Sequence, residues 1–182
     1  MTAIWIIGGV LLLAVVLIYN SLVAKKNQVG NIFASLDALL KKRYDLVPNL
    51  VETVKGYAGH ERAVLENIAN LRAQALAAPA GTAAHQQAES RLARSLGGIM
   101  AVAESYPQLK ADRNFLQLQA ALAEVEEQIS AARRAYNASV TDYNNALEML
   151  PTSLLASLLG YQRRPLFEID AAQREAVPVK FE

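Results

Sequence analysis

The sequence predicts an all-α fold, in which a single N-terminal transmembrane helix continues into an elongated antiparallel helical bundle. The first 24 residues contain no charged side chain, whereas the rest of the chain has about the charged fraction of a soluble domain. Beyond this segment apolar residues recur every three or four positions, and no stretch alternates apolar and polar residues for long. We therefore expect an anchor (1–24), a helical bundle domain (25–165) and an extended tail (166–182).

Residues 4–24 form an apolar run that is long enough to cross a bilayer. At ~1.5 Å per residue, a helix of this length covers ~30 Å, the thickness of the hydrocarbon core. Trp5 and Tyr19 lie near its two ends, where aromatic rings favour the membrane interface. A secretory signal peptide is the alternative, but no Lys or Arg precedes the run and no small-x-small cleavage site follows it. We interpret the run as a retained anchor.

The charges next to the run predict its orientation. Only the α-amino group precedes it, while Lys25 and Lys26 follow it directly. Basic residues remain on the cytoplasmic side of a membrane. We therefore expect a single-pass protein with its N-terminus outside and its C-terminal domain in the cytoplasm.

After the anchor, the apolar spacing predicts one long helix that reaches about residue 78. Pro48 lies inside it and should kink it, because proline cannot donate to the carbonyl of residue 44. The alternative is a tight turn at Tyr44-Asp45, with Asp45 as the N-cap and Pro48 in the first turn of a new helix. We favour the kinked helix, since the stripe keeps its phase across Pro48. The stripe consists of Val29, Ile32, Leu36, Leu40, Arg43, Val47, Leu50, Val54, Tyr57, Glu61, Val64, Ile68, Leu71 and Ala75.

A second helix is expected at about 83–105, after the breaker at 77–82. Thr82 is a plausible cap for it. Gly97 and Gly98 lie within this helix and weaken it by ~1 kcal/mol each relative to alanine. We interpret these glycines as a point where a neighbouring helix approaches closely.

A third long helix is expected at about 114–150, where the apolar spacing is almost strictly heptad, as in coiled coils and helical bundles. Pro151 should open a short helix at 152–159, and Gly160 should close it.

Arg43 is the most unusual residue of the first stripe, because a charged group on an apolar face is costly unless it is paired. One interpretation is an internal polar network that fixes helix register. In it Arg43 meets Asp45, or meets polar residues of the third long helix. The other interpretation is a protein-docking notch at the kink. The candidate motif comprises Arg43, Asp45, Pro48, Asn49, Tyr136, Asn137, Tyr143 and Asn144.

The catalytic motifs that we looked for in the sequence are incomplete or missing. His60-Glu61 begins like a zinc-protease motif, but the second histidine would have to stand at position 64, which is Val64. There is no cysteine, no phosphate-binding GK[ST] motif and no GxSxG. We expect no catalytic residue, metal ligand or cofactor, and the net charge of +1 gives no reason to expect nucleic acid as a partner.

Several residue strings resemble the LemA family over nearly the whole chain and in the family's order. One departure is Leu150 before Pro151, where the family would have phenylalanine. The matching strings are YNSLV (19–23), LKKRYDLVPNLV (40–51), VKGY (54–57), HE (60–61), YPQLKA (106–111), ARRAYN (132–137) and YN (143–144).

This resemblance implies a bacterial, membrane-anchored helical bundle of the inner membrane, without established catalytic activity. A relative takes part in building magnetosome membranes, and family members often accompany a membrane metalloprotease. We therefore expect a non-enzymatic scaffold that binds the lipid bilayer and assembles into homo-oligomers. The alternative is an accessory subunit of a membrane protease or of a membrane-remodelling machine, with that membrane protein as its partner. An uncharacterised enzyme is a remote third interpretation.

Overall fold

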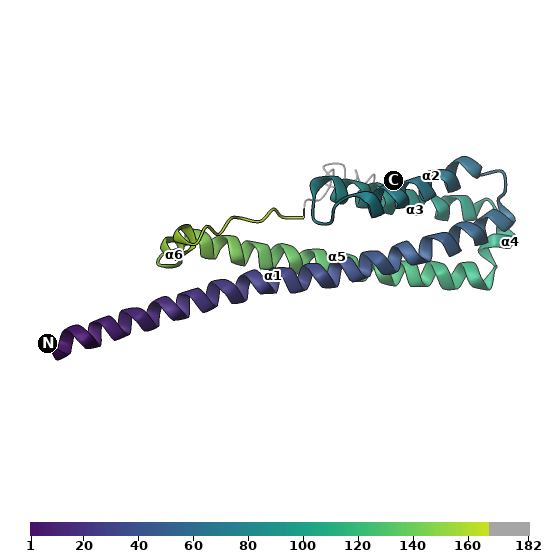
Figure 1. The fold of residues 1–182 in the computed structure, drawn as a ribbon. Coiled ribbons are helices and arrows are strands. Elements are labelled where there is room, and N and C mark those ends of the chain that lie inside the picture. The colour runs from purple at the N-terminus through teal and green to yellow at the C-terminus, as the bar shows by residue number, and fades with distance from the viewer. Residues whose placement is uncertain (168–182) are drawn as a thin grey trace, which may run out of the picture. The chain divides into compact units, whose positions relative to one another are not determined.

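The computed structural model describes residues 1–167, which form helices and no strands, so the predicted all-α class is confirmed. Residues 1–36 and 130–167 make up one compact unit, called unit 1, and residues 37–129 make up unit 2. Apart from its first two residues, the predicted tail lies outside the described part of the chain. The helices are α1 (Thr2–Tyr57), α2 (Arg62–Ala77), α3 (Ala83–Glu104), α4 (Pro107–Lys110), α5 (Arg113–Glu148) and α6 (Thr152–Leu158) (Figure 1).

Helix α1 continues through Pro48, which has no N–H to donate to the carbonyl of Tyr44. A side chain of α2 takes the place of this donor, because Arg72 Nε donates to Tyr44 O at 2.8 Å. The carbonyl that proline leaves without a helical donor thus keeps a hydrogen bond. The expectation of a helix through Pro48 is confirmed, and the alternative turn at Tyr44-Asp45 is wrong.

The same helix ends at Tyr57, so the expectation that it extends to about residue 78 is wrong. Residues 58–61 lie outside any helix, and α2 begins at Arg62. Gly56 and Gly59 lie at this break, and each disfavours a helix by ~1 kcal/mol relative to alanine. The chain reverses here, because α2 runs back along α1 and its Arg72 reaches the carbonyl of Tyr44.

Unit 2 is an antiparallel bundle of α1, α2, α3 and α5. Tyr57 at the end of α1 contacts Asp112 at the start of α5, whereas Arg43, earlier in α1, contacts Glu126, later in α5. The two helices therefore run in opposite directions. The apolar core is formed by Leu40, Val47, Leu50, Val54, Ala58, Leu65, Ile68, Ala75, Ala88, Leu92, Leu96, Ile99, Ala103, Leu109, Phe115, Leu122, Val125 and Ile129.

Helix α3 begins as predicted, since the Thr82 hydroxyl accepts a hydrogen bond from the His85 N–H at 3.2 Å. The expected close approach of a helix at Gly97-Gly98 is wrong. Both glycines are exposed, and a Cβ atom added to either would meet nothing within 4 Å. These glycines therefore lie on the outer side of α3.

Asp112 caps α5 and ties it to α1. Its Oδ1 accepts from the Phe115 N–H at 2.9 Å, which is the hydrogen bond of an N-cap residue. Its Oδ2 accepts from the Tyr57 hydroxyl, also at 2.9 Å. These hydrogen bonds, first the one from Phe115 and then the one from Tyr57, hold the pKa of the Asp112 carboxyl below its usual value.

We expect part of the stability of unit 2 to be lost in acid through Asp112. A carboxylate whose pKa is lowered by folding stabilises the fold above its unfolded pKa of ~3.9, and this contribution disappears as the pH falls through the lower folded pKa. Asp112→Asn keeps a capping side chain but removes the charge. Between pH 5 and pH 2 the variant should therefore lose less stability than the parent does in denaturant titrations. Asp37→Asn, at an exposed carboxylate in the same unit, is the control. An acid profile that Asp112→Asn leaves unchanged would contradict the assignment.

In unit 1 the first part of α1 packs against the last part of α5. Leu22, Val29 and Leu36 of α1 are buried at seven-residue spacing. The rings of Phe33 and Tyr136 lie 5.8 Å apart between their centroids. Helix α5 ends at Glu148, two residues before the expected end at Leu150, and Leu150 is 74% exposed.

The short helix α6 ends at a glycine, as predicted. Gly160 has a φ of +69°, a conformation that favours glycine. Tyr161 N–H donates to Ala156 O at 3.0 Å, and Gly160 N–H donates to Ser157 O at 3.2 Å. This pair of hydrogen bonds is the Schellman ending of a helix. It directs residues 161–167 away from α6.

Candidate functional site

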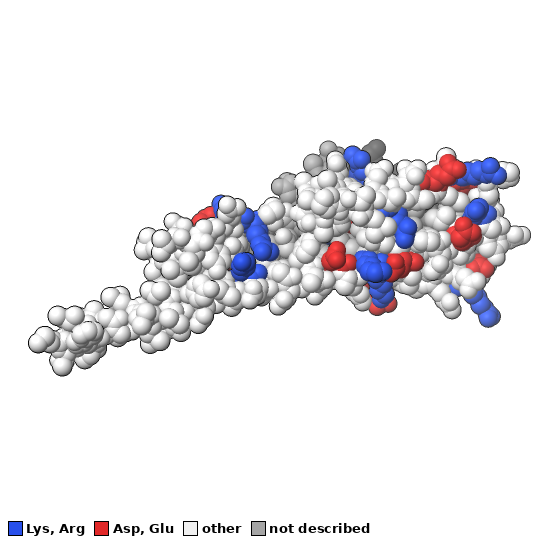
Figure 2. Space-filling view, viewed as in Figure 1, with Lys and Arg blue, Asp and Glu red and all other residues white. Residues whose placement is uncertain are grey.

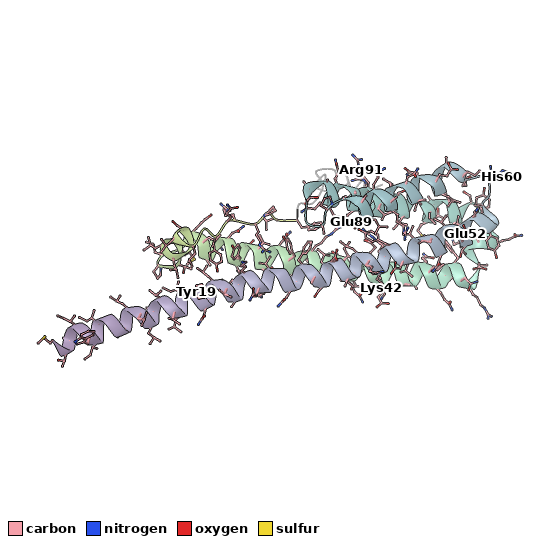
Figure 3. The ribbon with its side chains drawn as sticks, in the orientation of Figure 1. Tyr19, Lys42, Glu52, His60, Glu89 and Arg91 are labelled. Carbon is pink, nitrogen blue, oxygen red and sulfur yellow. The ribbon has the colours of Figure 1, made fainter. Side chains whose placement is uncertain are left out.

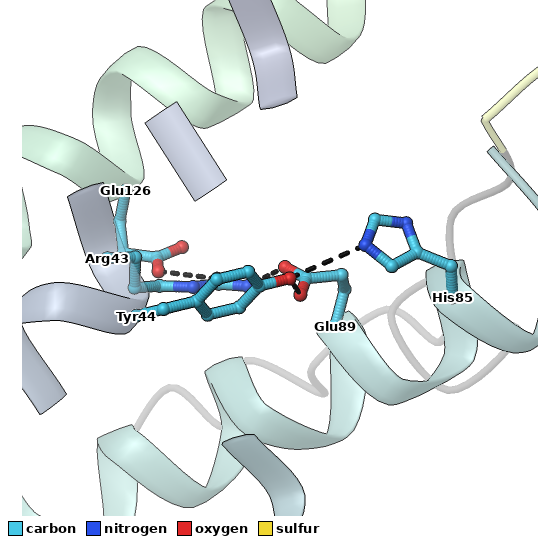
Figure 4. Close-up of polar contacts among 5 residues, drawn as sticks. All are labelled: Arg43, Tyr44, His85, Glu89 and Glu126. Atoms are coloured by element: carbon cyan, nitrogen blue, oxygen red, sulfur yellow. Dashed lines mark hydrogen bonds and ion pairs between the residues drawn. The ribbon is translucent and has the colours of Figure 1, made fainter. Parts of the chain in front are cut away.

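Arg43 is completely buried in unit 2 and contacts two carboxylates on two other helices (Figure 4). Its Nη2 forms an ion pair with Glu89 of α3, whose side chain is also 0% exposed. Its Nη1 donates to Glu126 Oε1 of α5 at 2.7 Å. The side chain of Glu126 is 40% exposed, so this carboxylate remains in contact with solvent. Arg43 thus joins α1, α3 and α5 through charged hydrogen bonds.

Two more buried side chains complete this Arg43 cluster, which we define as Arg43, Tyr44, His85, Glu89 and Glu126. The Tyr44 hydroxyl donates to Glu89, so both oxygens of that carboxylate are used. The same hydroxyl lies 3.4 Å from His85 Nε2. His85 and Glu89 are four residues apart and therefore share one face of α3.

The expected partners of Arg43 are corrected by this arrangement. Asp45 is exposed and pairs with Lys41 at 2.8 Å on the surface of α1. Pro48 and Asn49 are exposed as well. The polar residues expected from α5 lie in unit 1 and bind other groups. The sequence did hold a signal for Glu89, which stands three residues before the buried Leu92 and thus in the apolar phase of its helix.

The polar residues of α5 hold an extended segment, residues 162–167, through its backbone. Asn144 Nδ2 donates to Arg164 O, and Asn144 Oδ1 accepts from Arg164 N–H, both at 2.9 Å. Asn137 repeats the pattern with Phe167: its Nδ2 donates to the carbonyl at 2.9 Å, and its Oδ1 accepts from the N–H at 2.7 Å. Each amide therefore satisfies both backbone groups of one residue, much as a neighbouring strand would.

Each asparagine follows a tyrosine that binds the same segment. Tyr143 donates to Gln162 O at 3.1 Å, and Tyr136 lies 3.5 Å from Pro165 O. We call these four residues the Tyr-Asn ladder: Tyr136, Asn137, Tyr143 and Asn144. Burial raises the pKa of both tyrosine hydroxyls above the usual value, although the nearby Arg164 opposes the shift.

The spacing of the ladder explains why it fits this segment. Seven residues along a helix cover ~10.5 Å, and three residues of extended chain cover ~10 Å. Two Tyr-Asn pairs seven residues apart on α5 therefore meet backbone positions three residues apart. The ring of Phe167 closes the far end of the segment, with its centroid 6.2 Å from that of Tyr136 and 4.9 Å from Arg133 Cζ.

The expected membrane-interface residues all lie on α1. Trp5 is 81% exposed and Tyr19 is 45% exposed, and the large apolar side chains between residues 4 and 17 are exposed too. An 18-residue window near the start of α1 has a mean hydropathy of 2.5, and among the described helices only α1 is long and apolar enough to cross a membrane. Figure 2 shows it without acidic or basic side chains, and Figure 3 shows Tyr19 near its end. Lys25 is half-buried, and Lys26 Nζ lies 5.6 Å from the centroid of the Tyr161 ring.

Among residues 1–167, no three metal-ligating side chains come together. His60 is exposed at the turn between α1 and α2 (Figure 3). Arg43 and Glu89 are 0% exposed, so a substrate in solvent does not reach them.

A sequence model of the LemA family matches residues 32–181. The chain belongs to the LemA family. Strings that carried the resemblance to the family have structural roles in this chain: residues 40–51 supply Arg43 and Tyr44, and residues 132–137 and 143–144 supply the Tyr-Asn ladder.

Known relatives of this LemA-family chain include magnetosome proteins. Magnetosome protein MamQ 2 of Paramagnetospirillum magneticum is 23% identical over 175 residues, which cover 82% of this chain and 64% of that protein. MamQ of Magnetospirillum gryphiswaldense is 23% identical over 174 residues, with the same coverage. Protein LemA of Metamycoplasma hominis is 23% identical over 155 residues, which cover 85% of this chain and 71% of that protein. The chain thus spans less than two thirds of the length of the magnetosome proteins.

Proposed function

We propose that this LemA-family chain is a non-enzymatic scaffold, anchored in the inner membrane by α1 and assembled into homo-oligomers. The observation that carries the proposal lies within unit 1. There α1 passes from a fully exposed apolar surface to the buried residues Leu22, Val29 and Leu36 without leaving the helix. Exposed apolar surface of this extent requires a cover, and a bilayer provides one. No flexible linker separates the proposed span from the packed helices of unit 1.

The use of the polar side chains supports a scaffold rather than an enzyme. The Arg43 cluster pairs its charges inside unit 2, and the Tyr-Asn ladder uses its polar atoms on the chain's own backbone. Both arrangements hold helices or segments in register. The buried pair of Arg43 and Glu89 is closed to solvent, whereas an active site requires polar groups that converge on a space that a substrate can enter.

The proposed membrane location favours self-assembly. Confinement to two dimensions raises the local concentration of any anchored chain and so favours weak lateral contacts. The relatives named as magnetosome proteins support a role in organising a membrane. Lys25 and Lys26 favour the orientation in which the bundle faces the cytoplasm.

The full chain in lipid nanodiscs, measured by native mass spectrometry, tests the proposal. We expect particles that hold more than one copy, and the chain should remain with the membrane after alkaline extraction. A chain that alkali releases, or that is monomeric in detergent and in nanodiscs alike, would overturn the proposal. A second protein recovered in stoichiometric amount after crosslinking in cells, in place of further copies, would support the accessory-subunit alternative instead.

A further inference from the structure

A second apolar surface in unit 1 lies at the turn between α5 and α6. We call residues 149–164 the α6 end. Met149 is 63% exposed, Leu154 69% and Leu158 81%. Leu154 and Leu158 are four residues apart and lie on one face of α6, whereas Ala156 is 2% exposed and faces the protein. A short helix that is anchored on one side thus presents leucines outward.

The α6 end lies beside α1 at the point where the proposed span ends. Lys26 of α1 contacts Tyr161 of the α6 end, and Leu22, one turn earlier, is 0% exposed. The large apolar side chains before residue 18 are all exposed. Figure 1 shows α6 next to α1 at the end of α5 that is nearer to the N-terminus. A bilayer that surrounds the span therefore ends at the level of the exposed leucines.

Basic side chains gather beside these leucines. A surface hollow of about 380 Å³ is lined by Lys26, Arg163 and Arg164, together with the rings of Tyr143 and Tyr161. One acid lies near, because Glu148 pairs with Arg163 at 2.7 Å. The lining contains three cations and no carboxylate, so the hollow keeps an excess of positive charge even with Glu148 paired to Arg163. Figure 2 shows the basic side chains at this end of the unit.

We propose that the α6 end is a second membrane contact, in which the outward leucines enter the bilayer interface and the hollow binds the headgroups of anionic phospholipids. The inference rests on the proposed function, since α1 must span the membrane for the α6 end to reach it. Apolar side chains beside basic ones are the pattern by which short helices lie in an interface. Lysines and arginines close to a membrane surface attract anionic lipids. The bilayer is the favoured occupant because this surface continues that of the span within one unit.

The absence of cysteine from the sequence makes a direct test possible in the full chain. The variants Leu158→Cys, Leu12→Cys and Ala131→Cys, each made singly, are labelled with an environment-sensitive fluorophore and placed in phosphatidylcholine vesicles with or without phosphatidylglycerol. Nitroxide lipids then report the depth of each label. We expect quenching at 158 by a nitroxide near the headgroups, and quenching at 12 by a nitroxide deep in the acyl chains. Ala131 is exposed and lies at the start of the part of α5 that belongs to unit 1, at the end away from α6. The label at 131 should therefore remain unquenched.

A paired substitution tests the basic hollow. Phosphatidylglycerol should increase the quenching at 158 severalfold, and Lys26→Gln with Arg163→Gln should abolish this increase. Both side chains are exposed, so we expect the fold to persist, which circular dichroism checks. Lys110→Gln with Arg113→Gln removes two exposed cations from unit 2 and is the matched control. Equal quenching with and without the anionic lipid would overturn the headgroup assignment.

The labels at 12 and 158 separate this inference from the proposed function. Quenching at 12 with none at 158 would overturn the inference and leave the anchor in place. Absence of quenching at both positions would overturn the proposed function itself. The label at 158 could also remain unquenched while a short bismaleimide crosslinks position 158 of two copies. This result would mean that a second chain covers the leucines, and it too would overturn the inference.

Discussion

Replacing Arg43 with methionine should destabilise unit 2 by about 3–5 kcal/mol, the usual cost of removing one partner of a buried ion pair. Glu89, whose side chain is 0% exposed, would lose the cation that compensates its charge. Glu126 would be affected less, because its side chain reaches solvent. Hydrogen exchange of the α3 amides in the full chain measures the change, since these amides exchange when unit 2 opens.

The double variant Arg43→Met with Glu89→Leu is the decisive companion to this experiment. Replacing both charges by apolar groups of similar size removes the buried charge as well as its partner, and such replacements are often neutral or even stabilising. We expect the double variant to recover at least half of the stability that Arg43→Met loses. Lys42→Met, at the exposed neighbouring position, should cost little. If Arg43→Met cost no more than Lys42→Met, the cluster would not stabilise unit 2.

These variants also separate the two interpretations of the motif around Pro48. A cluster that stabilises unit 2 from inside accounts for Arg43 without any docking partner. The exposed residues Asp45 and Asn49 remain the part of the motif that another protein could contact. Their substitution should leave the stability of unit 2 nearly unchanged.

Removing the asparagines of the Tyr-Asn ladder should release the segment at residues 162–167. Each asparagine makes two hydrogen bonds to the backbone, and a hydrogen bond contributes about 1 kcal/mol net. Asn144→Ala should therefore lower the free energy of local opening by about 2 kcal/mol, which raises the equilibrium constant for opening ~30-fold. Asn137→Ala should act in the same way at Phe167, and the double variant should open further.

Limited trypsin digestion of the full chain measures this release, because the bond between Arg163 and Arg164 lies within the segment. As long as the segment closes faster than trypsin cleaves, the cleavage rate at this bond should rise by the same factor as the equilibrium constant for opening. Asn145→Ala, at the exposed next position on α5, is the matched control and should not change the rate. A cleavage rate that is the same for Asn144→Ala and Asn145→Ala would show that the ladder does not hold the segment.

Most individual helices could be predicted because their signals are local. The period of apolar residues located α3 and α5, and Thr82 and Gly160 marked a start and an end through their own backbone requirements. The reversal after Tyr57 was missed for an equally local reason. Residues 58–61 add about one helical turn, so the apolar stripe of α2 continues in phase with that of α1 although the chain has turned back.

The contacts within each unit depended on how the helices pack. Arg43 stands out in its stripe, which indicates a buried partner, yet Glu89 and Glu126 are 46 and 83 residues away. Likewise, the repeated Tyr-Asn pair on α5 was visible in the sequence. Its binding partner is the chain's own extended segment at residues 162–167, whose sequence has no periodic pattern that would identify it. A helical period reports which side of one helix faces the interior. Which helix or segment meets that side depends on where the chain reverses and which side chains can reach each other, and these are properties of the packed structure.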